Sequence, residues 1–240
     1  MAILEVRNIG KQFDNTKVLD DVSFSLEEGN ALAIIGSSGS GKTTLLRCLN
    51  FLETPDKGSI TVKGETLFDA SMPRREQEKE LRTKRLHFGM VFQSFNLFPQ
   101  YTALENVTLS EKLLAKEQSD FKQKKKEIYE RIEEHGVELL RQMGLAERMS
   151  HYPHQLSGGQ QQRVAIARAI AQAPPVILAD EPTGNLDSNS TREIMDILKS
   201  LHEEGRTVIL ITHDNDIAAQ AKRVVKIMDG KIVEDFYQEI

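Results

Sequence analysis

The sequence predicts an α/β fold in which a mixed, largely parallel sheet with flanking helices follows an antiparallel β region and holds an inserted helical subdomain. Three observations predict it. An apolar run at residues 31–35 leads through a glycine-rich loop into a helical pattern, and strands alternate with helices after residue 170. Residues 93–156 are helical in pattern and highly charged. The 240 residues have room for one substantial core, so we expect a single domain spanning 1–240.

The segments around the glycine-rich loop fit the antiparallel region. Residues 3–6, 22–26 and 59–62 alternate apolar and polar side chains, as strands with one buried face do. The run 31–35 is apolar throughout, which is typical of a strand covered on both faces of a parallel sheet. Near the C-terminus, Asp229 and Gly230 separate two short apolar segments, which predicts a tight hairpin.

Residues 36–43 carry the spacing G-x-x-x-x-G-K-[ST] between the apolar run and a helical pattern. Glycines let the backbone turn its N–H groups towards a phosphate, and the helix N-terminus adds partial positive charge. Lys42 would reach the β- and γ-phosphates, and the Thr43 hydroxyl would bind Mg²⁺. An ordinary Gly/Ser turn accounts poorly for this strand–loop–helix context. We therefore predict a P-loop NTPase core that binds ATP or GTP through Gly36, Ser37, Ser38, Gly39, Ser40, Gly41, Lys42, Thr43 and Thr44.

A second glycine-rich element, Leu-Ser-Gly-Gly-Gln at residues 156–160, opens another predicted helix. Ser157 fits the N-cap position, and the two glycines leave backbone N–H groups uncovered. Taken alone, this pattern favours a capped surface helix with a flexible entry. Together with the first loop it predicts two anion-binding helix ends, which one ATP could use only if they approached its phosphates from opposite sides. That arrangement suggests two copies of the chain with the nucleotide between them.

The two elements together resemble the motifs of the ATP-binding cassette (ABC) family of transport ATPases. The resemblance covers nearly the whole chain, and the motifs occur in the family's order. It implies a catalytic core of residues 1–92 and 161–240 and a helical subdomain of residues 93–160. It also implies that the signature residues contact the nucleotide of a second copy: Ser157, Gly158, Gly159 and Gln160.

The apolar segment 176–181 resembles the family's second Walker motif. A strand ending in Asp180 and Glu181 is costly to bury without a cation or partner, which favours a functional role. The resemblance implies that Asp180 holds Mg²⁺, directly or through water, and that Glu181 is the general base for the attacking water. Residues 185–187 resemble the D-loop that crosses the dimer interface, although Asp187 alone could simply cap a helix.

Three further residues take their predicted roles from the resemblance. His213 resembles the switch histidine that touches the γ-phosphate, and Gln93 resembles the Q-loop residue that senses Mg²⁺ and water. Phe13 stands where an aromatic ring stacks on adenine. Outside this pattern, His213 would be more typical of a capping or core histidine, Phe13 of a core residue, and Gln93 would carry no signal. Their ordered occurrence favours the functional interpretation.

Composition fits an ATPase that acts beside a membrane. No apolar run approaches the ~20 residues of a membrane helix, and the N-terminus lacks a signal-peptide pattern. We therefore expect a soluble, cytoplasmic protein, and the resemblance implies that it is peripheral, at the cytoplasmic face of the cell membrane. The formal net charge is −5 and no Lys/Arg run forms a stripe, so we expect no nucleic-acid partner.

Other features are expected to be structural. The single cysteine, Cys48, follows the phosphate loop and is predicted to be a small buried residue. Lysines at residues 122–126 are followed by glutamates, which predicts the solvated face of a helix. The charged stretch 69–84 is predicted to be a surface helix or loop, with no chemistry assigned.

Three functional classes agree with the motifs. The first is the ATPase of a transporter, with integral membrane permease subunits on other chains and, indirectly, an extracytoplasmic solute-binding protein. The second, a soluble ABC ATPase of DNA repair or translation, usually carries tandem cassettes or a very long insertion, for which this chain has no room. The third, a non-hydrolysing regulatory module, is disfavoured because Glu181 and His213 are both present.

The sequence points to two kinds of transported molecule. Residues 46–50 and 92–99 resemble the ATPases of polar amino-acid importers, whereas residues 179–188 resemble those of lipoprotein-release and macrolide-export systems. We favour import, because the residues after Gln93 lie in the region that meets membrane subunits. Composition alone makes the apolar residues there equally compatible with a local core and with a groove for a permease helix, and the resemblance favours the groove: Phe95, Leu97, Phe98 and Tyr101.

Overall fold

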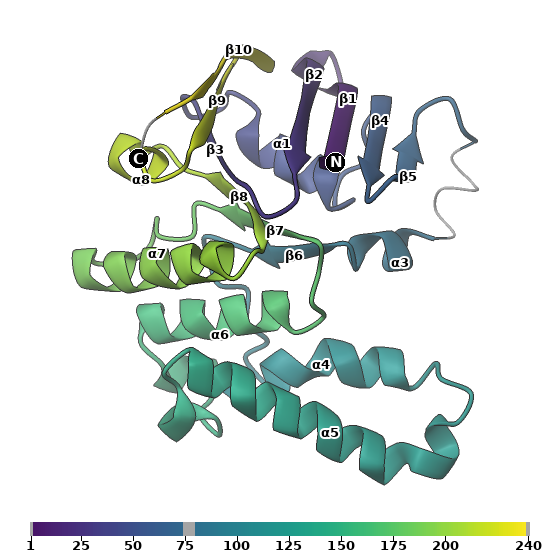
Figure 1. The fold of residues 1–240 in the computed structure, drawn as a ribbon, viewed down its shortest axis with the longest axis vertical. Coiled ribbons are helices and arrows are strands. Elements are labelled where there is room, and N and C mark those ends of the chain that lie inside the picture. Colours follow the sequence, from purple (N-terminus) through teal and green to yellow (C-terminus); the bar gives the residue numbers. More distant parts are fainter. Residues whose placement is uncertain (1, 74–79, 239–240) are drawn as a thin grey trace.

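The computed structural model describes residues 2–73 and 80–238 and confirms the predicted α/β fold (Figure 1). The first of two sheets is antiparallel, with the strand order β2-β1-β4-β5. The second has the order β10-β9-β3-β8-β7-β6, and all of its strands except β10 run parallel to their neighbours. The strands are β1 (Ala2–Phe13), β2 (Thr16–Glu27), β3 (Ala31–Ile35), β4 (Lys57–Val62), β5 (Glu65–Asp69), β6 (Phe88–Val91), β7 (Val176–Asp180), β8 (Thr207–Ile211), β9 (Arg223–Met228) and β10 (Lys231–Tyr237).

Helices form the layers between and below the sheets (Figure 1). Helix α1 (Lys42–Leu49) packs in one core with residues of both sheets. Helices α6 (Gly158–Ile170) and α7 (Ser188–Glu203) cover the other face of the six-stranded sheet. Beyond α6 lie α4 (Ala103–Ala115) and α5 (Phe121–Gln142). Among the described residues, the short helices are α3 (Leu81–Arg85), α8 (Asn215–Ala218) and two 3₁₀ turns, Ala146–Arg148 and Pro153–Gln155.

The central strands are buried on both faces, as the apolar run predicts. In β7, Val176 and Leu178 belong to the core that contains α1, whereas Ile177 and Ala179 belong to the core that contains α6 and α7. Side chains of a strand alternate between its faces, so a single strand contributes to both cores. The carboxyl ends of these strands are therefore held in place from two sides.

The helical subdomain is built on α4 and α5. Helix α4 begins with a capping box, in which Thr102 Oγ1 accepts the Glu105 N–H (3.3 Å) and the Glu105 carboxylate accepts the Thr102 N–H (2.8 Å). The two helices approach closely, because a Cβ at Gly136 would lie 2.5 Å from Thr108 Cγ2. The predicted boundary between residues 160 and 161 falls inside α6, which contacts both β6 and α4. Helix α6 thus connects the subdomain to the sheet.

The remaining structural predictions can be compared directly. The terminal hairpin is confirmed: β9 and β10 are antiparallel, and Asp229 (φ 47°) and Gly230 (φ 76°) are both left-handed, as a tight primed turn requires. The lysines at 122–126 are exposed, as predicted. Within the charged stretch 69–84, residues 74–79 lie outside the described residues. None of the helices in the described part of the chain is long and apolar enough to span a membrane.

Candidate active site

The phosphate loop follows β3 and leads directly into α1. Gly41 has φ 104°, and a Cβ there would lie 2.7 Å from the Val18 carbonyl oxygen. A Cβ at Gly36 would collide with the Ile227 carbonyl oxygen and approach Ser40 Oγ. At these two positions the loop therefore accepts only glycine. The packing of β2 and β9 against it holds the loop in shape.

The beginning of α1 is suited to an anion. Its N-cap residue, Gly41, makes no side-chain hydrogen bond to the helix, so the first N–H groups of the helix have no capping side chain. The buried Lys42 side chain donates to the carbonyl oxygens of Gly36 (2.9 Å) and Ser37 (2.8 Å). Burial lowers the pKa of Lys42, and the nearby carboxylates of Glu181 and Asp180 oppose that change. The cation is thus held in the loop itself.

Helix α1 and strand β7 bring the predicted metal-binding oxygens together. Thr43 Oγ1, at the start of α1, donates to Asp180 Oδ1 at the end of β7 (3.1 Å). Burial raises the pKa of Asp180, while the Thr43 hydrogen bond lowers it. A hydroxyl and a carboxylate oxygen are ligands of the kind that Mg²⁺ binds, and a cation beside Asp180 would favour its charged form. The predicted pair therefore fits a magnesium ion.

Glu181 occupies an unusual backbone position just after β7. Its φ is 45°, in the left-handed region that non-glycine residues rarely adopt. Its N–H donates to the Ile211 carbonyl oxygen (3.0 Å), and its carbonyl oxygen accepts the Gly184 N–H (3.0 Å). Such conformations cost of order 1–3 kcal/mol and cluster at functional sites. The backbone turns here so that the Glu181 side chain leaves the sheet at its carboxyl edge.

His213 lies beside Glu181, as the order of parallel strands predicts. Strand β8 neighbours β7, and His213 Nδ1 lies 3.1 Å from Glu181 Oε2. The imidazole is mainly exposed, whereas the carboxylate is largely covered. Both side chains line a hollow of about 230 Å³, together with Thr183, Gly184, Leu186, Thr191, Thr212, Asp214 and Ile217. This hollow can admit water next to the two side chains.

Gln93 follows β6 and faces the loop after Glu181. Its carbonyl oxygen accepts a hydrogen bond from Asn185 Nδ2 (3.1 Å). A Cβ at Gly184 would lie 2.6 Å from Gln93 Nε2, so the Gln93 side chain lies directly against this loop and would have to move for any larger residue. Arg168 donates to the carbonyl oxygens of Phe95 (3.0 Å) and Asn96 (2.6 Å), and burial lowers its pKa to about 10. Asn185 and Arg168 hold the segment around Gln93 but were not among the predicted site residues.

The predicted signature residues form the start of α6. Ser157 is the N-cap, and it exchanges hydrogen bonds with Gln160 in a capping box. The glycines also serve packing, because a Cβ at Gly159 would lie 2.8 Å from Ser190 Oγ of α7. Asp187 is the N-cap of α7, and its carboxylate accepts the N–H groups of Asn189 and Ser190. Within the described residues, no hydrogen bond or ion pair joins residues 36–44 to residues 157–160.

Phe13 lies at the end of β1, well away from the carboxylates in sequence. Its ring is 41% exposed, which agrees with a residue that can stack on a ligand. The ammonium group of Lys11 lies 5.1 Å from the ring centroid. One face of the ring is therefore already covered by a cation. An incoming base would use the other face.

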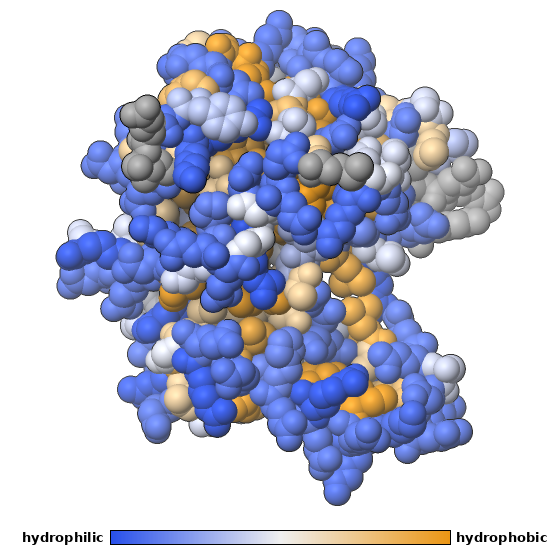
Figure 2. Space-filling model, viewed as in Figure 1, coloured by the Kyte–Doolittle hydropathy of each residue, from blue (hydrophilic) through white to orange (hydrophobic). Residues whose placement is uncertain are grey.

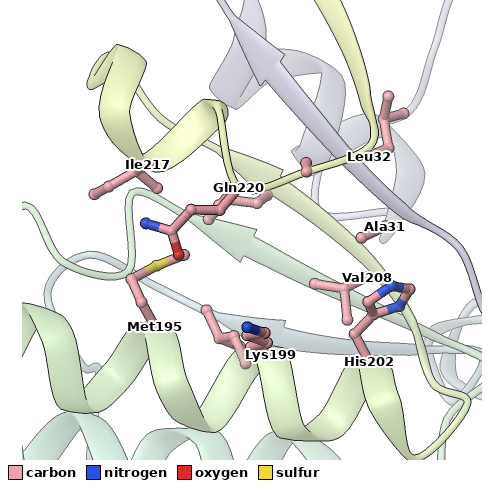
Figure 3. Close-up of a pocket in the computed structure, with 11 residues that line it drawn as sticks. Ala31, Leu32, Met195, Lys199, His202, Val208, Ile217 and Gln220 are labelled. Carbon is pink, nitrogen blue, oxygen red and sulfur yellow. The ribbon is translucent and has the colours of Figure 1, made fainter. Parts of the chain in front are cut away.

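A second crevice does not belong to the nucleotide site. Figure 3 shows it between α7 and the segment after α8, with Met195, Val208 and Ile217 among the side chains that line it. It also contacts Ala31, the first residue of β3, whereas the phosphate loop follows the other end of that strand. Its lining is mainly apolar and includes no residue of the phosphate loop. None of the predicted site residues Lys42, Asp180 and Glu181 lines this crevice.

Known proteins share this arrangement. Residues 19–184 match the family model described as ABC transporter. The chain is 42% identical to an uncharacterised ABC transporter ATP-binding protein of Methanocaldococcus jannaschii, covering 97% of this chain and 98% of that protein. It is 43% identical to the L-cystine transport system ATP-binding protein TcyN of Escherichia coli, covering 98% and 90%. It is 42% identical to the macrolide export ATP-binding/permease protein MacB of Burkholderia pseudomallei, covering 97% of this chain but 34% of that protein.

A solved structure supports the same assignment. The dimeric post-hydrolysis state of the ATP-binding cassette MJ0796, bound to ADP and Pi, matches this chain with a TM-score of 0.81 and 35% identity over 99% of both chains. The glycine loop on α1, the paired carboxylates after β7 and the capped signature helix therefore occur here in the fold of a known nucleotide-binding cassette. The chain belongs to the ABC transporter family, as an ATP-binding subunit that hydrolyses ATP.

Proposed function

We propose that ATP hydrolysis here uses Glu181 as general base and that Mg²⁺ is held by Thr43 and Asp180. The observation that carries this proposal is the 3.1 Å contact between Thr43 Oγ1 and Asp180 Oδ1, with Glu181 next along the chain at the same edge. The described residues contain no cluster of three or more His, Cys, Asp or Glu side chains, and Mg²⁺ bound partly by phosphate needs none. When bound, the ion offsets phosphate charge.

The other residues have roles that follow from their positions. When nucleotide binds, the Lys42 ammonium group leaves its two loop carbonyl acceptors and donates to the β- and γ-phosphates instead. Its positive charge then offsets part of their negative charge. The N–H groups at the start of α1 bind the same phosphates. Glu181 accepts the proton of the attacking water in the hollow that it shares with His213. His213 holds the carboxylate before nucleotide arrives and contacts the γ-phosphate afterwards, and Gln93 orients the water.

The complete site needs a second copy of the chain. The signature residues lie at the start of α6, and no polar contact links them to the phosphate loop of the same chain among the described residues. A symmetric pair would place each signature against the other's nucleotide, and a two-fold arrangement is the commonest one for homo-oligomers. The structural relatives of this fold include dimeric cassettes. The ATP-bound form is therefore a dimer with two nucleotides between its subunits.

A groove between α3 and α4 provides the contact with membrane-spanning permease subunits. Figure 2 shows hydrophobic residues on the surface between these helices. The hollow has a volume of about 280 Å³, and Phe98 is 43% exposed beside it. An ion pair between Arg82 and Glu117 links the two sides of the groove. The residues that line it are Arg82, Arg85, Leu86, Phe98, Asn106, Leu109, Ser110, Leu113, Leu114 and Arg168.

A short permease helix would place its apolar side on this surface. The predicted anchors have different surroundings. Leu97 packs against the core that contains α6 and α7, whereas Phe98 and Tyr101 form an edge-to-face pair with centroids 5.9 Å apart. The ATPase would then lie at the cytoplasmic face of the membrane, with a solute-binding protein contacting only the permease. A nucleic-acid partner forms no part of this proposal.

The transported molecule we propose is a polar amino acid, taken up by import. The resemblance of residues 92–99 to such importers is supported by the similarity to TcyN, an ATP-binding protein of an L-cystine transport system. Export of a macrolide or lipoprotein is the second candidate, supported by residues 179–188 and by the similarity to MacB. In this chain Gly184 and Asn185 of that segment contact Gln93, which gives them a role in the ATPase under either assignment.

The experiment that tests the proposed chemistry is Glu181→Gln, because the amide keeps the shape of the carboxylate and loses its basicity. We expect kcat to fall at least about 1000-fold, within the range assigned to a general base, while ATP still binds. The mutant should elute as a dimer in size-exclusion chromatography with Mg-ATP. Asp216→Asn, an exposed carboxylate on α8, is the matched control and should hydrolyse ATP normally. Wild-type turnover by Glu181→Gln would remove this residue from the role of base.

Direction of transport needs a separate measurement. The chain would be reconstituted in vesicles with the membrane proteins encoded beside its gene. ATP-dependent uptake of labelled cystine or another polar amino acid from the extracytoplasmic side supports import. ATP-dependent movement of a macrolide or lipoprotein out of the bilayer or the cytoplasmic side, without amino-acid uptake, would replace import by export.

A further inference from the structure

Gln162 lies on α6, within two turns of the signature residues, and its side chain is fully buried. Its Nε2 donates to the carbonyl oxygens of Phe92 (3.2 Å) and Pro182 (2.7 Å). Phe92 immediately precedes Gln93, and Pro182 immediately follows Glu181. One amide group thus joins the signature helix to the two loops that carry the proposed water-orienting residue and general base.

The orientation of this amide follows from its neighbours. Both groups that it contacts are carbonyl oxygens, which can only accept hydrogen bonds, so the NH₂ side of the amide must face them. On the other side, Gln162 Oε1 is buried and has no hydrogen-bond partner within the described residues. A buried acceptor without a partner costs about 1–3 kcal/mol. The residue therefore keeps two directed contacts at a cost that an apolar side chain would avoid.

Two other side chains also bond the segment around Gln93, and their contacts differ from those of Gln162. Asn185 binds the Gln93 carbonyl oxygen, and Arg168 binds those of Phe95 and Asn96. Each of these side chains holds the Gln93 segment from one other element. Gln162 alone among them bonds both that segment and the loop after Glu181.

We propose that Gln162 is a positioning residue that transmits the position of α6 to both catalytic loops of its own subunit. When a partner's nucleotide contacts the start of α6, any displacement of the helix moves the Nε2 donor. Because one donor group bonds both carbonyl oxygens, Phe92 at 3.2 Å and Pro182 at 2.7 Å, these carbonyls move with it. Gln93 and Glu181 then reach their working positions together. This inference rests on the roles proposed above for these two residues and for the dimer.

The test is Gln162→Met, which approximately preserves side-chain length and volume but removes both hydrogen bonds. We expect kcat to fall about tenfold, the effect of losing roughly 1.4 kcal/mol of transition-state stabilisation. The KM for ATP should stay within about twofold, because no group that binds nucleotide changes. Gln161→Met is the matched control, since Gln161 Nε2 bonds only the Leu156 carbonyl oxygen beside the same helix. A folded Gln162→Met protein with normal kcat would overturn the proposal.

A second measurement separates positioning from a merely structural role. If Gln162 acts through Gln93, its replacement in a Gln93→Ala background should add less than the tenfold effect seen in the wild type. Strict multiplication of the two effects, or a loss of kcat matched by an equal loss of folded protein, would reject positioning. The buried Cys48 thiol, whose pKa burial raises to about 12, reports folding through its lack of reaction with a thiol reagent.

Glu181→Gln, measured in the same assay, distinguishes failure of this inference from failure of the proposed function. Normal turnover by Glu181→Gln would show that the general base was wrongly assigned. Loss of turnover by Glu181→Gln together with normal turnover by Gln162→Met would reject only the role of Gln162.

Discussion

The carboxyl edge of the six-stranded sheet and the start of α6 both present groups that can bind phosphate, but they differ in their contacts within the chain. At the sheet edge, Lys42 bonds its own loop, Thr43 bonds Asp180, and Glu181 lies beside His213. At α6, Ser157 bonds only its own helix. The first region is connected across three strands, whereas we propose that the second contacts phosphate only in a partner subunit.

This difference in contacts predicts which substitutions change the affinity for ATP and which change the rate of hydrolysis. Of the groups already assembled within one chain, those that contact phosphate can bind nucleotide as soon as it arrives, so changes to them should weaken binding, whereas Glu181 is needed only for the chemical step. Groups that need a second copy act only after binding, so changes there should spare the affinity of one chain and lower the hydrolysis rate. Substitutions of the phosphate-binding groups at the sheet edge and of the signature residues should therefore affect different measured quantities.

The largest expected effect on affinity comes from Lys42→Ala. Loss of a charged hydrogen-bond donor to phosphate costs about 1.5–3 kcal/mol, which corresponds to an increase in Kd of about 10- to 150-fold. Without ATP the mutant should melt near the wild-type temperature, because burial already penalises this ammonium group. Titration calorimetry and the ATP-induced shift of Tm would measure both effects.

Lys199→Ala is the matched control for that substitution. Its side chain is 69% exposed, and its ion pair with Glu203 is 4.0 Å long, so it should leave Kd unchanged. An unaltered Kd for Lys42→Ala would mean that the loop backbone alone binds the phosphates.

At the start of α6, Gly158→Asp tests whether the signature residues face the nucleotide of a partner. A Cβ at Gly158 would lie 3.3 Å from Leu186 Cδ2, so a side chain needs only a small adjustment. A carboxylate there would oppose the partner's γ-phosphate, and we expect kcat to fall about 30-fold, equivalent to roughly 2 kcal/mol, with the Kd of the single chain unchanged. Gly158→Asn has nearly the same shape without the charge and should lose much less. Equal losses in both variants would assign the effect to bulk.

The sequence predicts the sheet-edge region well for a physical reason. Its residues fall in short runs, each directly after a strand, and the parallel order of those strands brings the runs together. Residues that hold Gln93 leave no such pattern: Asn185 is 92 positions away from it, and Arg168 is 73 positions from Phe95. Side-chain hydrogen bonds to backbone carbonyls depend on tertiary packing, so the hydrophobic periodicity of the sequence does not predict them. Gln162 was missed for the same reason.

Strand lengths were also underestimated. Strands β1 and β2 extend over 12 residues each, although the alternating patterns covered only 3–6 and 22–26. Their pairing contains several register shifts, and Asn8 has φ 51°. Such irregularities move side chains from one face to the other and interrupt the alternation. Strand β5 and helix α3, of five residues each, are too short to produce a clear pattern.

Phe98→Asn tests the groove between α3 and α4. We propose that this groove, like the start of α6, acts only in contact with another subunit. Removing a half-exposed aromatic anchor should cost roughly 1–2 kcal/mol, so association with the membrane subunits should weaken about tenfold. ATPase activity of the isolated subunit should be unchanged. Phe236→Asn is the matched control, because Phe236 is 40% exposed and lies on β10, away from the groove. Co-purification and transport in reconstituted vesicles would measure the effect, and equal assembly of both variants would make Phe98 a local core residue.

Phe13→Ala should give the smallest effect, because this residue belongs to neither region's phosphate contacts. Stacking of a base on an aromatic side chain contributes about 1–3 kcal/mol, and the exposed ring with Lys11 on one face places Phe13 at the lower end. The KM for ATP should rise about fivefold while kcat stays the same, since the adenine takes no part in the chemistry. Phe13→Tyr keeps the ring and should behave as the wild type. A fall in kcat in Phe13→Ala would show that adenine contacts also help to close the dimer, and the separation between affinity and turnover would then be incomplete. An unchanged KM would instead remove Phe13 from the site, because a ring that stacks on adenine cannot be deleted without loss of affinity.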